Sequence, residues 1–344
     1  MNLFIITIFL FILIYYLNEK LKKKTFLLNY KGQTHQKFLG QKNIPLSGGL
    51  FLLIFFIIFL PVNNSNYLLL FLSLIFCIGF ASDTNFLSSP KLRFIIQIII
   101  ISIFVVILDI RIVQTKFVVI DLLLENIYFK YFFSIFCLLI LINGSNFIDG
   151  LNGLLLGYFS LIIFIILYLN LSFNFELQIH KKVLICLVII MIFLFILNIY
   201  YKLFMGDSGS YILSLFMGYS LIKFYEFNQE ISPYFIVLLL WYPCFENFFS
   251  ILRKFSLKKS PIDADNNHLH QLIFTYVGKT KILKKFDSNN IASIFILTYN
   301  LIIFSFGLTN VSNTQLQIFL LILNILIYTV LYFRLFSFKY KIKF

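Results

Sequence analysis

Residues 183–199 read VLICLVIIMIFLFILNI, a run without a single charged side chain. A helix of about 17–25 apolar residues crosses the hydrocarbon core of a bilayer, so this run predicts a membrane-spanning helix. The whole chain has the same character, since 60% of its 344 residues are hydrophobic and 12% are charged. Ordinary soluble domains are about 45–50% apolar and about 25% charged. The composition therefore excludes a soluble enzyme, a disordered chain and a secreted disulfide module.

Apolar runs of similar length recur along the sequence and predict an all-α integral membrane protein, a polytopic bundle of 10–11 spans. The eleven candidate spans lie near residues 1–17, 46–61, 66–82, 92–109, 129–144, 151–169, 183–199, 208–224, 233–251, 291–308 and 315–336. The longest polar connection is residues 252–290, and no soluble domain is expected. Residues 110–126 alternate polar and apolar side chains, which predicts a short β-hairpin.

Lysine and arginine divide unequally between the two sides of this bundle. The connections at 18–45, 83–93, 200–207 and 252–290, with the tail after residue 333, hold 22 of the 28, and the other side holds six. Loops rich in these residues stay in the cytoplasm. The N-terminus is therefore expected outside and the C-terminus in the cytoplasm. The net charge of +14 then reflects topology, and no nucleic-acid partner is expected.

Two short polar clusters on the expected cytoplasmic side contain a single carboxylate each. Asp83 ends an apolar run and is followed by Lys91 and Arg93, an arrangement that suits phosphate chemistry. A solvated loop is the alternative. In residues 205–210, MGDSGS, Asp207 stands beside small residues that leave room for Mg²⁺, which usually takes one or two carboxylates plus substrate phosphates. A helix cap is the alternative there.

A third cluster lies between two predicted spans, where residues 143–154 read NGSNFIDGLNGL. Asn146, Asp149 and Asn152 recur at every third position, so a turn of helix would group them on one face. Carboxamide and carboxylate groups at this density indicate a binding site. A helix-capping turn is the alternative, because Asn and Asp cap helices well.

The fourth cluster is in the long connection, where residues 260–271 read SPIDADNNHLHQ. Two histidines with Asp265 could bind a metal, or a diphosphate if the histidines are protonated. The spacing of His268 and His270 differs from the i,i+4 spacing of zinc sites. A polar loop is the alternative. All four clusters fall on one predicted face, which favours an active site there.

With these motifs the chain resembles the polyprenyl-phosphate N-acetylhexosamine-1-phosphate transferase family, or glycosyltransferase family 4. The motifs cover residues 30–285. The resemblance is closer to the undecaprenyl-phosphate N-acetylglucosaminyl-1-phosphate transferase branch than to the phospho-muramoyl-pentapeptide transferases. The matching strings are Ser47–Gly49, Gly79–Asp83, Asn143–Leu154, Gly206–Ser210 and Ser260–His270.

The resemblance implies one transferase domain over residues 1–344, in the bacterial cytoplasmic membrane with its active site on the cytoplasmic face. A polyprenyl phosphate such as undecaprenyl phosphate would attack the sugar-linked phosphorus of a UDP-N-acetylhexosamine. UMP would leave, and the lipid-diphospho-sugar would initiate a cell-envelope polysaccharide such as lipopolysaccharide O-antigen. Mg²⁺ would be required, with Mn²⁺ as a substitute. A homodimer is compatible with the resemblance.

The resemblance also implies roles for particular residues. Asp207 would be the Mg²⁺ ligand, and Asp83 and Asp149 would hold or deprotonate the lipid phosphate, or reach the metal. His268 and His270 would grip the diphosphate or the nucleotide. The further substrate-binding candidates are Asn143, Asn146, Asn152, Lys91, Arg253 and Asp265.

Three positions depart from the family pattern: Ser82 replaces the first of two paired aspartates, Asn152 replaces an aspartate, and Gln271 replaces a histidine. The serine at position 82 removes an acid that could act as the base for the lipid phosphate. Three outcomes follow: Asp149 serves as the base, no dedicated base is needed, or activity is lost. Retained activity is favoured because five candidate groups remain on one face. The alternatives are an inactive relative that binds polyprenyl phosphate and a secondary transporter.

Overall fold

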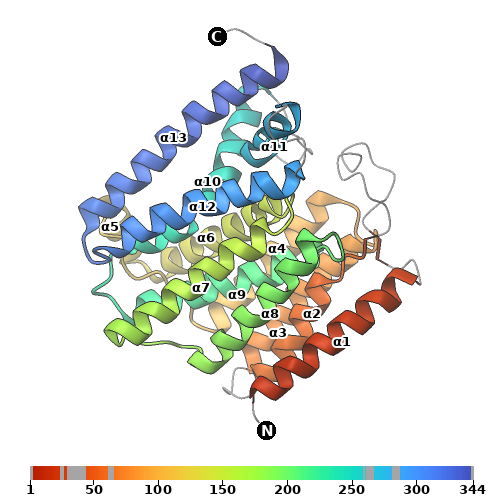
Figure 1. Cartoon of the computed structure of the whole chain (residues 1–344). Helices are drawn as coiled ribbons and strands as arrows, with labels where there is room; N and C mark the ends of the chain where they lie inside the picture. Colours follow the sequence, from red (N-terminus) through yellow and green to blue (C-terminus); the bar gives the residue numbers. More distant parts are fainter. Residues whose placement is uncertain are drawn as a thin grey trace.

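The computed structural model describes residues 3–23, 27–28, 44–60, 66–258, 260, 267–280 and 287–341. In these ranges the chain forms helices, with an isolated β-bridge between Leu28 and Pro45 and no strands. The helices are α1 (Leu3–Lys23), α2 (Gly48–Phe59), α3 (Asn66–Asp83), α4 (Pro90–Ile107), α5 (Val118–Leu124), α6 (Ile127–Ile148), α7 (Leu154–Phe173), α8 (Lys181–Ile199), α9 (Gly206–Phe227), α10 (Pro233–Ser256), α11 (Leu269–Lys279), α12 (Ser288–Leu308) and α13 (Thr314–Tyr340). Figure 1 shows α9 in the middle of the bundle, with α1 on one side and α13 on the other.

The prediction of an all-α membrane protein is confirmed by these helices. Among the described residues, eight helices are long and apolar enough to cross a membrane, namely α3, α4, α6, α7, α8, α10, α12 and α13. Each of the eleven predicted spans coincides with a helix, and the remaining two helices, α5 and α11, are short. The number of spans that cross the bilayer and the sides of the two termini remain predictions.

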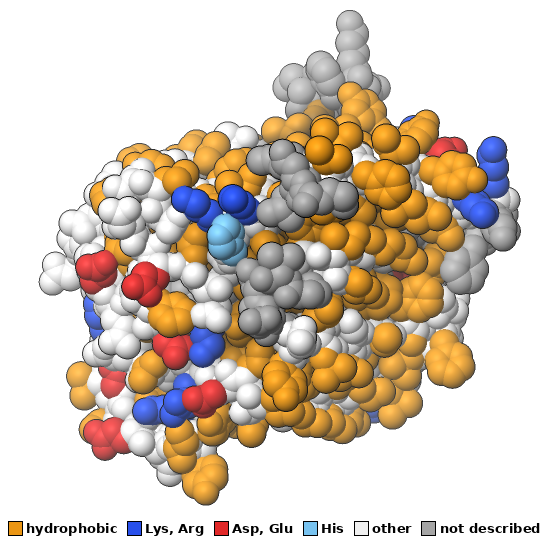
Figure 2. Space-filling view, turned by 90° about the horizontal axis from the view of Figure 1, so that it is seen from below, with side chains coloured by type: hydrophobic (Ala, Val, Ile, Leu, Met, Phe, Trp, Pro, Cys, Tyr) orange, Lys and Arg blue, Asp and Glu red, His pale blue; other side chains and the backbone are white. Residues whose placement is uncertain are grey.

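The surface of the bundle carries many exposed hydrophobic side chains. On α4, Ile95, Ile99 and Ile103 are each about half exposed and lie one turn apart. Figure 2 shows hydrophobic side chains over a broad part of one face, with most of the charged side chains gathered beside them. Soluble monomers rarely expose apolar patches of this extent. The apolar surface is therefore suited to contact with lipid.

The predicted hairpin at residues 110–126 is wrong. This segment contains irregular backbone followed by the short helix α5. The Asp121 carboxylate accepts hydrogen bonds from the Thr115 amide and hydroxyl, each 2.7 Å long, and the Ile112 amide donates to Ser134 Oγ of α6 at 3.0 Å. These polar side chains satisfy backbone and side-chain donors that a hairpin would have paired within its own ladder.

The central helix α9 is buried from Ser208 through Tyr219 and packs against α2, α3 and α6. It is not among the eight apolar helices, because glycines, serines and Asp207 occupy its first turns. These small residues allow close helix packing. A Cβ atom at Gly79 of α3 would lie 2.4 Å from the Ser208 Cα atom, so the two backbones touch where α3 ends and α9 begins.

Candidate active site

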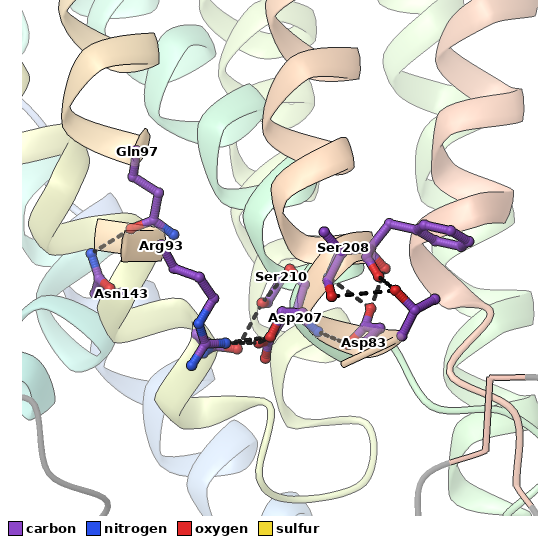
Figure 3. Close-up of polar contacts among 12 residues, drawn as sticks. Asp83, Arg93, Gln97, Asn143, Asp207, Ser208 and Ser210 are labelled. Atoms are coloured by element: carbon purple, nitrogen blue, oxygen red, sulfur yellow. Dashed lines mark hydrogen bonds and ion pairs between the residues drawn. The ribbon is translucent and has the colours of Figure 1, made fainter. Parts of the chain in front are cut away.

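The N-terminus of α9 is held by a carboxylate from another helix. Asp83, the last residue of α3, accepts hydrogen bonds from the Asp207 amide at 2.9 Å and from the Ser208 amide and hydroxyl at 3.1 and 2.6 Å (Figure 3). The first amides of a helix have no partner within it. Gly206 precedes them with φ +71°, and a Cβ there would lie 2.6 Å from an Asp83 oxygen. The buried Asp83 therefore caps α9, and both its oxygens are engaged.

The Asp207 side chain lies at the mouth of this helix and is about a quarter exposed. Its Oδ2 atom accepts a 2.5 Å hydrogen bond from the Ser82 hydroxyl and pairs with the Arg93 guanidinium of α4. Arg93, labelled in Figure 3 beside Asp207, also donates to the Ser82 hydroxyl. Ser82, which replaces an acid of the family pattern, thus orients Asp207 together with Arg93. The Asp207 carboxylate is more accessible than that of Asp83.

A third carboxylate, Asp149, follows the end of α6 and is half-buried. The Gly206 backbone hydrogen-bonds to it. Burial, with the nearby carboxylates of Asp207 and Asp83, raises the pKa of Asp149 well above its usual value. One turn earlier, Asn146 accepts a 2.9 Å hydrogen bond from the Ser210 hydroxyl of α9. Three carboxylates from α3, α6 and α9 therefore meet around one helix terminus.

A second polar cluster adjoins the first and contains both predicted histidines. Glu246 of α10 and His268 are hydrogen-bonded, with 2.9 Å between Oε1 and Nδ1. The His270 Nδ1 atom lies 4.0 Å from Glu246 Oε2, and the two imidazole rings stack with centroids 5.5 Å apart. Glu246 and His270 are fully buried, and burial lowers the pKa of His270 to about 3. His270 is therefore neutral at pH 7.

The segment around Asp149 links the two clusters. Phe147 packs on the His268 ring with centroids 4.6 Å apart. A Cβ at Gly150 would lie 3.1 Å from His270 Nε2. Asp149 stands between these residues and is bonded to the start of α9. The structure thus brings Asp83, Asp149 and Asp207 into one group and sets the histidines against the neighbouring residues Phe147 and Gly150.

Asn152 does not share a helix face with Asn146 and Asp149, so that expectation is wrong. Helix α6 ends at Ile148, and the chain turns through Gly153 at φ +72°. The Asn152 amide instead donates to Asn289 Oδ1 at 2.7 Å and its side chain to Asn290 Oδ1 at 3.2 Å, both in α12. Asn152 therefore ties α12 to the turn.

Two other amide side chains extend the site. The Asn143 side chain donates to the Leu139 carbonyl at 2.8 Å and lies 3.5 Å from Gln97 Oε1 of α4, deeper in the bundle (Figure 3). Gln271 accepts a 3.2 Å hydrogen bond from the His268 amide and so caps α11. These contacts are structural, and the role of Asn143 toward substrate remains a prediction.

The predicted cationic residues lie apart from the carboxylates. Lys91 is exposed at the start of α4, where Arg93 makes the contact with Asp207. Arg253 donates to the Asn267 carbonyl and to the Tyr332 hydroxyl, the latter at 2.8 Å, and so joins α10 to α13. Asp265 falls outside the described residues. A role for these three in binding substrate remains a prediction.

Two residues of the site were missed from the sequence. Arg93 was noted beside Lys91 but not selected, although an arginine suits a carboxylate or phosphate better than a lysine does. Glu246 is the single charged residue in the predicted span 233–251. An acid inside a membrane span is a functional signal by default, and this signal was available.

The three aspartates at the start of α9 have the chemistry of a site for a hard divalent cation. Asp83, Asp149 and Asp207 supply three carboxylates against the single guanidinium of Arg93. In the part of the chain that the structure describes, no group of three or more His, Cys, Asp or Glu residues could hold a metal by itself. Mg²⁺ commonly takes one or two protein carboxylates and completes its shell with phosphate and water. Asp207, with Asp149, fits that pattern.

Part of this chain matches a known protein family. Residues 65–225, from α3 through most of α9, match the glycosyl transferase family 4 model. Three similar proteins are called undecaprenyl-phosphate alpha-N-acetylglucosaminyl 1-phosphate transferase. The Thermotoga maritima protein is 32% identical over 82 residues, which cover 24% of this chain and 27% of that protein. The Salmonella typhimurium protein is 28% identical over 280 residues, 78% of this chain and 75% of that protein.

The third, from Escherichia coli strain K12, is 27% identical over 150 residues, 42% of this chain and 41% of that protein. The chain thus aligns with about a quarter of the first relative, three quarters of the second and two fifths of the third. The resemblance inferred from the sequence motifs is confirmed by these matches. The family match contains Asp83, Asp149 and Asp207 together with Arg93.

Proposed function

Because residues 65–225 of this chain match the glycosyl transferase family 4 model, we propose that it transfers a sugar 1-phosphate to a polyprenyl phosphate. The donor would be a UDP-N-acetylhexosamine and the acceptor undecaprenyl phosphate. A lipid phosphate oxygen would form a bond to the sugar-linked phosphorus, and the bond from that phosphorus to UMP would break. The observation that carries the proposal is the convergence of three carboxylates and one arginine at the start of α9.

The charges of the site explain how two anionic substrates could meet there. The amides that open α9 are already bonded to Asp83 and Asp149, so they are not free to bind a phosphate. Three carboxylates would repel a diphosphate unless cations intervene. Mg²⁺, or Mn²⁺ in its place, held by Asp207 and Asp149, would neutralise the negative charge of the diphosphate. Arg93 is the positive charge that the protein itself contributes to this site.

The remaining roles follow from the accessibility of each group. Phosphoryl transfer depends mainly on alignment and on stabilisation of charge. Asp149 would share the cation with Asp207, and a lipid phosphate monoester, whose second pKa is about 6, demands little basicity from the protein. Asp83 would act by fixing α9, and Ser82 by orienting Asp207. A dedicated acid at position 82 is then not needed.

The setting of the reaction is also part of the proposal. We place the site on the cytoplasmic face of a bacterial inner membrane, where the end rich in Lys and Arg would raise the local concentration of a nucleotide sugar. The product would initiate a cell-envelope polysaccharide such as O-antigen. A homodimer remains a prediction that cross-linking in membranes would test.

The experiment is a UMP release assay on purified protein with undecaprenyl phosphate, UDP-N-acetylglucosamine and MgCl₂. We expect release that requires the lipid and stops with a chelator, and none from Asp207→Ala. A matched control is Glu226→Gln, because Glu226 pairs with Lys223 toward the opposite end of α9. No UMP from folded wild-type protein with any UDP-N-acetylhexosamine would contradict the proposal.

A second candidate has one observation in its favour, the serine at position 82 in place of an acid. In that case the chain would bind a polyprenyl phosphate without turning it over. Retention of labelled undecaprenyl phosphate by wild-type protein, with no UMP formed, would support this alternative.

A further inference from the structure

Glu246 is an acid buried within an apolar helix, and it does not belong to the cluster of three aspartates at the start of α9. Its side chain is fully buried, and it is the single charged residue from Pro233 through Ile251. An uncompensated carboxylate in such a place costs several kcal/mol, so its neighbours must stabilise it. The groups that face it are the two imidazoles of His268 and His270 and the hydroxyls of Tyr242 and Tyr328.

The contacts of Glu246 are directed at the start of α11. Its Oε1 atom is 2.9 Å from His268 Nδ1 and accepts a 3.2 Å hydrogen bond from the Leu269 amide. One carboxylate oxygen therefore holds both the His268 ring and the Leu269 backbone at the start of α11. Carboxylate contacts of this kind fix which imidazole nitrogen carries the proton.

The other sides of the His268 ring are also confined. Phe147 packs on it with centroids 4.6 Å apart, and the His270 ring stacks on it at an interplanar angle of 11°. His268 is 4% exposed and its Nε2 atom has no hydrogen-bond partner in the described part of the chain, while His270 is fully buried. His268 is thus held by one nitrogen and has the second left for a ligand beside the Asp149 segment.

We propose that Glu246 is a positioning residue: it holds the His268 proton on Nδ1, so that the Nε2 lone pair faces a hydrogen-bond donor of the substrate, a hydroxyl or amide N–H of the sugar nucleotide. This inference rests on the proposed sugar 1-phosphate transfer. The Nε2 lone pair can accept a hydrogen bond from such a donor, whereas an N–H at that position would oppose it. His270 stacks on the ring and does not touch substrate. Glu246 acts through the start of α11, which it holds at the His268 ring and the Leu269 amide.

The test is nitrogen NMR on protein labelled with ¹⁵N-histidine. The chain has four histidines, so single His→Gln variants assign each signal. In wild-type protein we expect His268 to carry its proton on Nδ1. Glu246→Ala removes the oxygen that accepts from Nδ1, so no acceptor holds the proton on that nitrogen. We expect the His268 ring signals to change places in this variant.

The activity of Glu246→Ala gives a second measurement. A wrong histidine tautomer lowered kcat about 10⁴-fold when the orienting aspartate of a serine protease was replaced by asparagine, so we expect a fall of about 10²–10⁴-fold. KM for the UDP-sugar should change little, and Glu226→Gln should match wild type in both measurements. A circular dichroism melt confirms that each variant is folded.

The outcomes separate this inference from the proposed function. Wild-type His268 with its proton on Nε2, or identical His268 signals in wild type and Glu246→Ala, would overturn the inference whatever the turnover. An Nδ1 proton that moves in the variant, in a protein that releases no UMP, would support the role of Glu246 in orienting His268 and contradict the transfer reaction instead.

Discussion

Replacing Gly79 by alanine should damage the active site from within the bundle. The added Cβ would lie 2.4 Å from the Ser208 Cα atom, and both lie on helix backbones that cannot yield as a side chain does. Carbon atoms in contact are about 3.5–4.0 Å apart, so α3 and α9 would have to separate by about 1 Å. Overpacking of this kind costs about 1–3 kcal/mol of folding free energy.

The separation would act on the site through Asp83, which lies one turn beyond Gly79 on α3. Its hydrogen bonds to the Asp207 amide and to the Ser208 amide and hydroxyl are 2.6–3.1 Å long, and a displacement of about 1 Å would break most of them. A misplacement of about 1 Å in a catalytic group can cost about 100-fold in rate. Gly79→Ala should therefore lower turnover about 100-fold and lower Tm.

The assay is UMP release together with a thermal melt in the same detergent. Gly278→Ala on α11 is the matched control, because a Cβ there would meet Ser288 Oγ at 3.6 Å and its Cβ at 3.9 Å, which is ordinary contact. The control should equal wild type in turnover and Tm. Wild-type turnover and Tm in Gly79→Ala would refute the claim that the close approach of α3 and α9 builds the site.

Three further predictions concern charge, pH and topology. Arg93→Ala should lower turnover at least tenfold more than Lys91→Ala, because Arg93 alone of the two pairs with Asp207; equal losses would contradict this. The pKa of His270 is lowered to about 3 in the folded protein, so below about pH 6.5 a proton binds preferentially to the unfolded chain. Tm should therefore fall as the pH drops below about 6.5, and it should fall less in His270→Gln. A pH dependence of Tm that is unchanged in this variant would refute the prediction. In a background without native cysteines, a cysteine at Lys258 should react with an impermeant reagent only after permeabilisation and one at Glu125 without it; the reverse pattern would invert the topology.

The fold was largely predictable because the bilayer sets the length of an apolar helix. All eleven apolar runs are helices. They include α9, which begins within the predicted polar motif MGDSGS at residues 205–210. That α9 lies at the centre could not be predicted, since an apolar run buried in protein resembles one that faces lipid. The hairpin failed because a short alternation is a weak signal, and Asp121 captured donors that a hairpin ladder would need.

The sequence predicted which residues belong to the candidate site better than it predicted what each residue does there. Motif positions identified Asp83, Asp149 and Asp207, which the structure brings together. The sequence could not show that Asp83 caps a helix that begins more than a hundred residues later. Asn152 was misplaced because the i,i+3 pattern assumed a helix that in fact ends at Ile148. These failures concern long-range contacts and turns, which local periodicity does not encode.

The most direct test of the account is the mass of the lipid that purified protein forms from undecaprenyl phosphate and each of a panel of UDP-N-acetylhexosamines. The account predicts, for at least one donor, a lipid heavier by one N-acetylhexosamine 1-phosphate, with an equal amount of UMP. A lipid heavier by the sugar alone, with UDP released, would contradict it, and so would the absence of any lipid product from folded protein.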